Sequence, residues 1–173
     1  PPVPDGSAEA PRILVACVGN VLLGDDGFGV EVARRLSDAP LPEDVRVADF
    51  GIRAVHLAYE LLEGYDALVL VDALSRGAAP GTLFVLEPDA GDGLDGAAGV
   101  DAYGRHPAAV LATARALGAR LDRVRVIGCE PADVDEGIGL SPSVARAVDE
   151  AAKLVREVVA SLRSDRRQAD SHA

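Results

Sequence analysis

Two apolar runs constrain the fold of this chain more than any other feature of its sequence. Arg12–Val18 reads RILVACV, and Ala67–Val71 reads ALVLV. A strand that faces water on one side alternates apolar and polar residues, whereas a continuous apolar run is typical of a strand covered on both faces. The two runs therefore predict the middle of a parallel sheet with helices on either side.

The remaining elements alternate in the order that such a sheet requires. Further strands are expected over Val45–Phe50, Thr82–Leu86 and Arg123–Cys129, and helices over Phe28–Ser37, Val55–Leu62, Pro107–Leu117 and from Pro142 to Leu162, with Ser141 as the cap of the last. The fourth strand follows the third too closely for a helical crossover, so it is expected to run antiparallel at an edge. We predict an α/β fold with a single-domain, mostly parallel five-stranded sheet and helices on both faces.

The length and composition exclude several classes of protein. The chain has 173 residues, which fits one domain over 12–163, with disordered segments at 1–11 and 164–173. The net charge of -11, with one lysine, makes nucleic acid a poor partner. No apolar run reaches the roughly 20 residues of a membrane span. The first residues lack a secretory signal pattern, and Cys17 and Cys129 read as buried thiols, so a cytoplasmic protein is expected.

The loop after the first strand carries two adjacent carboxylates in a glycine-rich turn. Gly19–Gly29 reads GNVLLGDDGFG, which does not meet the dinucleotide fingerprint, and Asp25 and Asp26 would repel a pyrophosphate. One of the two acids is expected to cap the following helix. A dinucleotide site is therefore disfavoured, and the acid pair favours a cation.

A third carboxylate ends the third strand at the same edge of the predicted sheet. Asp72 should lie close to the first-loop acids, where the carboxylates would repel one another unless a cation lies between them. A receiver domain shares such acids but requires a lysine after the fifth strand, where this chain has Gly128–Glu130. The edge therefore predicts a divalent metal site.

Histidine supplies the expected third ligand type, since neutral imidazole together with carboxylates suits a borderline cation. His106 precedes the helix that begins at Pro107, whereas His56 reads as a surface residue. The acidic loop 89–96 fails the calcium-loop spacing, and no serine or cysteine nucleophile signature occurs in the sequence.

The ordered set of motifs resembles the [NiFe]-hydrogenase maturation endopeptidases over Arg12–Leu162. The motifs that carry the resemblance are GNVLLGDDGFG at 19–29, DFGIR at 49–53, VDA at 71–73, PGT at 80–82, GCEP at 128–131 and GIGLS at 137–141. Members of this family remove a short C-terminal extension from the hydrogenase large-subunit precursor once nickel has been inserted. The resemblance implies a metal-dependent aspartic-type endopeptidase, with that precursor as its partner.

The resemblance also implies which residues form the site. Asp26 and Asp72 match the family's two acids, as catalytic residues and metal ligands. The family's histidine falls on Tyr103 here, and His106, three residues later, is expected to replace it. Asp49 and Gly51 are implied as substrate contacts. The metal is nickel carried by the substrate, with no organic cofactor.

Two other functions remain open at this point. One is a non-catalytic metal-sensing or chaperone module on the same scaffold, and the substitution at Tyr103 favours it. The other is a nucleotide-binding module, which the acidic first loop disfavours.

Overall fold

The computed structural model describes residues 12–88 and 106–173 and contains one five-stranded sheet in the order β2-β1-β3-β5-β4. Its elements are β1 (Ile13–Val18), α1 (Phe28–Leu36), β2 (Val45–Gly51), α2 (Ala54–Glu60), β3 (Ala67–Ala73), β4 (Leu83–Leu86), α3 (Pro107–Ala116), β5 (Val124–Cys129) and α4 (Pro142–Asp170), with short 3₁₀ turns η1 (Gly24–Gly27) and η2 (Leu61–Glu63). The predicted strands and helices are confirmed within two residues at each end, apart from the end of α4.

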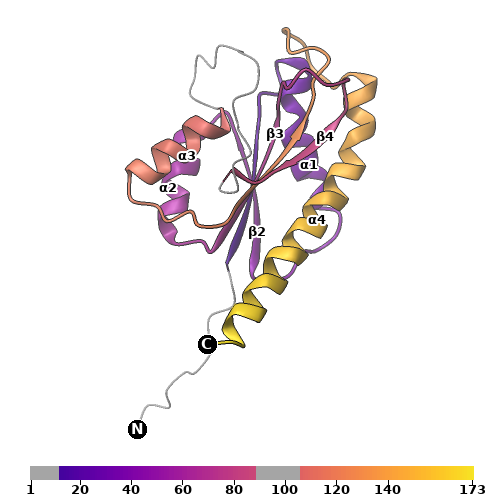
Figure 1. Cartoon of the computed structure of the whole chain (residues 1–173). Coiled ribbons are helices and arrows are strands. Elements are labelled where there is room, and N and C mark those ends of the chain that lie inside the picture. Colours follow the sequence, from indigo (N-terminus) through magenta and orange to yellow (C-terminus); the bar gives the residue numbers. More distant parts are fainter. Residues whose placement is uncertain (1–11, 89–105) are drawn as a thin grey trace.

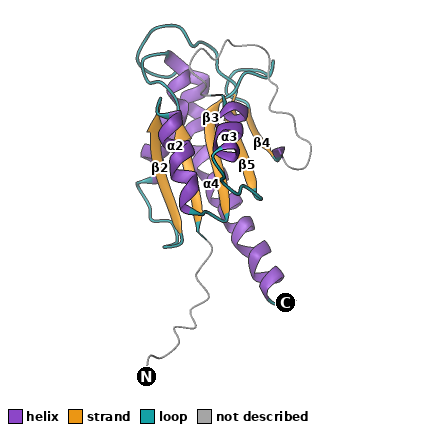
Figure 2. Cartoon of the chain, turned by 90° about the vertical axis from the view of Figure 1, so that its left-hand side faces the viewer, coloured by secondary structure: helices purple, strands orange, loops and turns teal. Residues whose placement is uncertain are grey.

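Helices cover both faces of the sheet, as the uninterrupted apolar strands predict. Alternate residues of β1 point to opposite faces: Ile13, Val15 and Cys17 pack in the core beneath α1 and α4. Leu14, Ala16 and Val18 belong to the second core, beneath α2 and α3. The two pairs of helices lie on opposite sides of the sheet in Figure 1, and Figure 2 shows α2 and α3 in front of it.

Four strands run parallel, and β4 alone pairs antiparallel with β5 at the edge of the sheet. The expected antiparallel edge strand is therefore confirmed. The chain passes from β1 to β2 on one side and then to β3 on the other side of β1. The loops after β1 and β3 consequently leave the sheet in different directions, and ligands of open α/β sheets bind at such a switch point.

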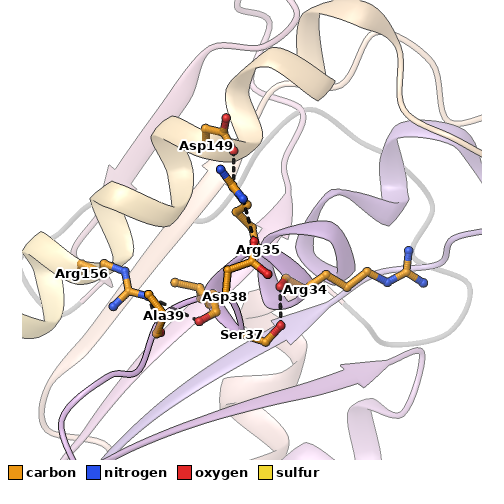
Figure 3. A network of polar contacts seen from close by, with 8 residues as sticks. Arg34, Arg35, Ser37, Asp38, Ala39, Asp149 and Arg156 are labelled. Atoms are coloured by element: carbon orange, nitrogen blue, oxygen red, sulfur yellow. Dashed lines mark hydrogen bonds and ion pairs between the residues drawn. The ribbon is translucent and has the colours of Figure 1, made fainter.

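Helix α4 is fastened along α1 by arginine contacts (Figure 3). The guanidinium of Arg35 donates to Asp149 over 2.5 Å, and Arg156 donates to the carbonyl of Ala39 over 2.7 Å. Exposed ion pairs of this kind contribute little free energy, but Arg156 also satisfies carbonyl groups just beyond the end of α1. These contacts hold the first half of α4 against α1 and the segment that follows it.

The end of α4 differs from the sequence-based expectation of a disordered tail at 164–173. The helix continues to Asp170, because no glycine or proline interrupts it after Leu162 and because ion pairs attach its last turns to the sheet. Arg163 pairs with Asp44 over 2.9 Å, and Arg166 pairs with Asp66. The expected disordered segment at 1–11 lies outside the described residues.

No helix within 12–88 and 106–173 combines the length and the apolar surface needed to cross a lipid bilayer.

Gly29 allows α1 to lie directly against the carboxyl ends of the central strands. A Cβ atom at this position would lie 2.2 Å from the carbonyl oxygen of Val18 and 2.7 Å from that of Val71. Both contacts are with backbone atoms, which cannot rotate away. The first turn of α1 is thus held at the point where β1 and β3 end.

We predict that Gly29→Ala lowers the free energy of unfolding by about 3 kcal/mol, because the backbone clash outweighs the gain of roughly 1 kcal/mol in helix propensity. Urea unfolding followed by circular dichroism measures the change. Gly118→Ala is the control: its site is open but has φ +102°, so strain alone should cost about 1 kcal/mol. Equal losses in the two variants would contradict the close approach of α1.

Candidate functional site

The carboxyl edge of the sheet brings together the acids that the sequence singled out. The turn η1, which contains Asp26, lies against β3, which ends with Asp72 and Ala73. Asp72 is 7% exposed, and Asp26 is half-buried. The loop after β1 therefore contacts β3, the strand that carries Asp72 near its carboxyl end.

Asp49 lies at the same edge, on the other side of β1. It pairs in register with Cys17, whose other neighbour is Val71 of β3. Burial raises the pKa of the Cys17 thiol above its ordinary value, and the nearby charges of Asp49 and Asp72 raise it further. The carboxyl ends of β2, β1 and β3 thus carry negative charge around a neutral thiol.

Neither cysteine has the environment of a nucleophile. Both are buried free thiols, as expected. Burial, followed by the charges of Asp25 and Glu130, raises the pKa of the Cys129 thiol to about 12. A reactive cysteine needs a lowered pKa and access to solvent, and neither thiol has them.

The two adjacent acids of the first loop have different environments. Asp25 is 1% exposed, and its carboxylate accepts hydrogen bonds from the amides of Ala132 (2.8 Å), Asp133 (3.1 Å) and Ser141 (2.7 Å). The hydroxyl of Ser141 donates a fourth, over 2.8 Å. Asp25 therefore joins the loop after β1 to the loop between β5 and α4.

These hydrogen bonds determine the charge state of Asp25. Burial alone would raise the pKa of its carboxyl group, but the hydrogen bonds from Ser141, Ala132 and Asp133 together hold the pKa below its ordinary value of 3.8. The buried group is thus a carboxylate near neutral pH.

The expected acid cap of α1 is wrong, whereas Ser141 is the N-cap residue of α4 as expected but makes no side-chain cap. Gly27, not an acid, occupies the N-cap position of α1, because Asp25 is directed across to the other loop. Ser141 does precede α4, and Pro142 begins that helix, but the Ser141 hydroxyl donates to Asp25 and makes no capping hydrogen bond.

Asp26 lies half-buried at the carboxyl edge of the sheet, where the backbone around it fixes its position. Its carboxylate accepts a hydrogen bond from the amide of Asn20 over 3.0 Å. The loop folds back closely at this point, since a Cβ atom on Gly19 would lie 2.1 Å from the carbonyl oxygen of Asp26. A glycine before Asn20 is therefore required to bring Asp26 to the edge of the sheet.

The predicted substrate contacts, Asp49 and Gly51, form a tight turn at the end of β2. The Asp49 carboxylate accepts from the amide of Gly51 over 2.8 Å, and Gly51 has φ +51°. Arg53 closes the turn by donating to the carbonyl of Asp49 over 2.7 Å. Asp49 is exposed, so it remains accessible to a ligand at the carboxyl edge of the sheet.

His106 serves as the N-cap of α3. Its Nδ1 accepts a hydrogen bond from the amide of Ala108 over 3.2 Å, so the proton of the neutral ring is on Nε2. Ligation through Nδ1 would use the same lone pair, and ligation through Nε2 would place the proton on Nδ1. In either case, metal binding would break the hydrogen bond that Nδ1 of His106 accepts from the amide of Ala108.

Within the described residues, no group of three or more His, Cys, Asp or Glu side chains is arranged to hold a metal ion. Asp26, Asp72 and His106 thus do not form a ready-made ligand group, and their role as ligands stays a prediction. Tyr103 and the acidic loop 89–96 lie outside the described residues.

Sequence reasoning missed a further buried carboxylate, Glu130. It is 6% exposed and accepts hydrogen bonds from the amides of Arg76 (2.7 Å) and Gly77 (3.2 Å). It therefore holds the loop that follows Asp72. Its position directly after an apolar strand was the available signal, because an acid there can reach the amides of neighbouring loops.

The fold and the site define a doubly wound α/β protein with acidic side chains at its topological switch point. The sequence model described as hydrogenase maturation protease matches residues 30–158. The chain belongs to this family, which confirms the resemblance.

Individual relatives agree with this assignment. The hydrogenase expression/formation protein HupD of Rhodobacter capsulatus is 37% identical over 150 residues, covering 85% of this chain and 71% of HupD. The hydrogenase 2 maturation protease of Escherichia coli is 30% identical over 154 residues, covering 88% and 91% of the two chains. The solved structure of the hydrogenase maturating endopeptidase HybD from E. coli superposes with a TM-score of 0.72 at 30% identity, covering 89% and 93%.

We predict that Asp25→Asn lowers the free energy of unfolding by about 3 kcal/mol, because an amide nitrogen cannot accept the hydrogen bonds that the loop donates. Since the folded pKa is lowered, the contribution of the carboxylate is present above the unfolded value of 3.8 and is lost as pH falls through the folded value. The gap between wild type and variant should therefore close in acid. Urea unfolding at a series of pH values measures it.

Asp26→Asn is the matched control for this prediction, since the carboxylate of Asp26, next to Asp25 in the chain, is only half-buried. It should cost less than about 1 kcal/mol. A larger loss for Asp26→Asn than for Asp25→Asn would reverse the assignment of the two acids.

Proposed function

We propose that this protein is an endopeptidase that removes the C-terminal extension of a nickel-loaded [NiFe]-hydrogenase large-subunit precursor. The observation that carries the proposal is the contact between η1, which contains Asp26, and β3, which ends beside Asp72, in a chain of the maturation protease family. The expected cytoplasmic location fits this role and stays a prediction.

In this proposal the nickel ion belongs to the substrate, and the protein binds it through carboxylates. Asp26, which lies in η1, and Asp72, at the end of β3, would be these carboxylates. Two carboxylates supply part of the coordination of a borderline cation, and the ligands that the precursor provides supply the rest. Recognition of the metal would then select precursors that already carry nickel.

The third protein ligand in the proposal is the imidazole of His106. Its ring leaves the amide of Ala108 when it binds, and the loss of one cap costs about 1 kcal/mol, which a bond to the metal offsets.

The other residues of the edge would orient the peptide that is cut. The turn at Asp49–Gly51 lies at the carboxyl edge of the sheet, and the exposed carboxylate of Asp49 would contact the substrate. A bound metal can polarise the scissile carbonyl or activate water. Binding the metal near the peptide brings the reacting groups together, which by itself accelerates a reaction substantially.

The second candidate is a non-catalytic metal-sensing or chaperone module on the same scaffold. The observation that favours it is Tyr103 at the position of the family's histidine, because a neutral phenol is a poor ligand for nickel. Such a module would bind the precursor without shortening it.

Co-expression with the precursor should separate the two functions. With the wild-type protein the large subunit should lose its C-terminal extension, and with Asp72→Ala it should stay full length, since processing should fall about 100-fold or more. Intact-mass spectrometry of the large subunit measures the cut. Inhibitors of serine and cysteine proteases should have no effect.

Asp122→Ala, an exposed acid that lines a pocket beside Gly64 and Tyr65 at the other end of the sheet, is the control and should process normally. Normal processing by Asp72→Ala would remove Asp72 from the site. Binding of the precursor by the wild type without any cut would favour the non-catalytic module.

Calorimetry with Ni²⁺ and Cd²⁺ tests the ligand set in the isolated protein. The double variant Asp26→Ala, Asp72→Ala should abolish binding, because both carboxylates are removed. His106→Ala should weaken binding by about tenfold or more, whereas Tyr103→Phe should change it little, since phenol ligation requires loss of a proton with a pKa near 10. A larger effect of Tyr103→Phe would make Tyr103 the third ligand.

A further inference from the structure

Apolar side chains project into water beside the candidate site. Leu22 is 58% exposed and Ile138 is 87% exposed, and they come from the loop after β1 and the loop between β5 and α4. A parallel β-bridge between Leu23 and Gly137 places the two segments side by side. Together with Val21, which is 37% exposed, they form what we call the apolar ridge (Val21, Leu22 and Ile138).

The ridge is held outward by an ordered backbone. The amide of Gly24 donates to the carbonyl of Gly137 over 2.8 Å, and the amide of Gly137 donates back to that of Leu22 over 2.9 Å. The buried carboxylate of Asp25 fixes the same two loops. The exposed apolar groups therefore cannot fold inward to escape water, which is typical of a surface that binds a partner.

A pocket of about 500 Å³ opens next to the ridge. Val21 and Ile138 line it together with Leu140 and Val148. Its volume is sufficient for an apolar side chain of a partner, and side chains that insert into such pockets dominate the affinity of protein interfaces.

The charge around the ridge indicates what kind of surface covers it. Asp133, Asp135 and Glu136 lie on the same loop as Ile138, and all three are exposed. In the part of the chain that the structure describes, none of them forms an ion pair with an arginine or lysine. A partner with an apolar patch bordered by basic side chains would be complementary in both respects.

We propose that the apolar ridge and its pocket are the docking surface for the hydrogenase large-subunit precursor, through an apolar patch of the precursor that basic residues border. This inference rests on the proposed function, and it assigns a role to a surface that does not include Asp26, Asp49 or Asp72. Asp26 follows Leu22 by four residues, and its amide donates to the carbonyl of Leu23 over 3.1 Å. A precursor bound on the ridge would therefore be presented to the candidate acids.

The test is binding and processing of the purified, nickel-loaded precursor by the full-length protein. Leu22→Ser, Ile138→Ser should raise Kd and KM at least about tenfold, because the contact area is lost, and should leave kcat at saturation within about twofold. Asp135→Lys, Glu136→Lys should slow association at low salt, and the difference should shrink as salt is added.

Leu62→Ser, Leu117→Ser is the matched control: these leucines are 41% and 45% exposed and lie toward the opposite edge of the sheet. It should bind and process the precursor like the wild type. All variants should keep the unfolding midpoint of the wild type, since the side chains are exposed.

Two failures are distinguishable. Wild-type protein that neither binds nor shortens the precursor would overturn the proposed function and this inference with it. Normal processing by the wild type, with unchanged Kd and KM in the Leu22→Ser, Ile138→Ser variant, would overturn the docking surface alone. A similar loss in the control variant would do the same, because the effect would not be specific to the ridge.

Discussion

The buried carboxylate of Asp25 is the interaction on which the functional edge depends. It connects the loop after β1 to Ala132, Asp133 and Ser141, so a single side chain positions two loops and the beginning of α4. Hydrogen bonds to a charged group stabilise more than neutral ones, and each unpaired amide left by their loss would add a desolvation cost. Both Asp26 and the apolar ridge lie on segments that this group holds.

Adjacent acids can thus have separate tasks. The carboxylate oxygens of Asp25 accept hydrogen bonds from the protein and are buried, whereas Asp26 is half-buried at the carboxyl edge of the sheet. The same division applies after β3 and β5, where Glu130 is used to hold the loop that follows Asp72. In both places a buried carboxylate that holds the backbone lies close in the chain or in space to a candidate ligand, so the protein itself positions Asp26 and Asp72.

The sequence predicts the layers of this fold well because its apolar patterns are local. Uninterrupted runs identify the central strands, and the short connection before Leu83–Leu86 identifies the antiparallel edge. The roles of Asp25 and Ser141 are a different matter, since the two residues are 116 positions apart and each fits a helix cap when it is considered locally. The cap formed by His106 is local, since Ala108 lies two positions later, but histidine is not among the residues that typically cap a helix, so the sequence did not indicate it.

The candidate ligands differ in how firmly they are held. Asp72 belongs to a strand paired on both sides, and Asp26 is fixed by the amide of Asn20, so the two acids are in place before a metal arrives. His106 is the N-cap of α3, and under the proposed function it would give up a hydrogen bond worth about 1 kcal/mol in order to bind. That cost is small compared with a bond to a metal, and it favours the capped ring when no cation is present. Under the proposed function, recruitment of His106 would therefore depend on nickel in the substrate.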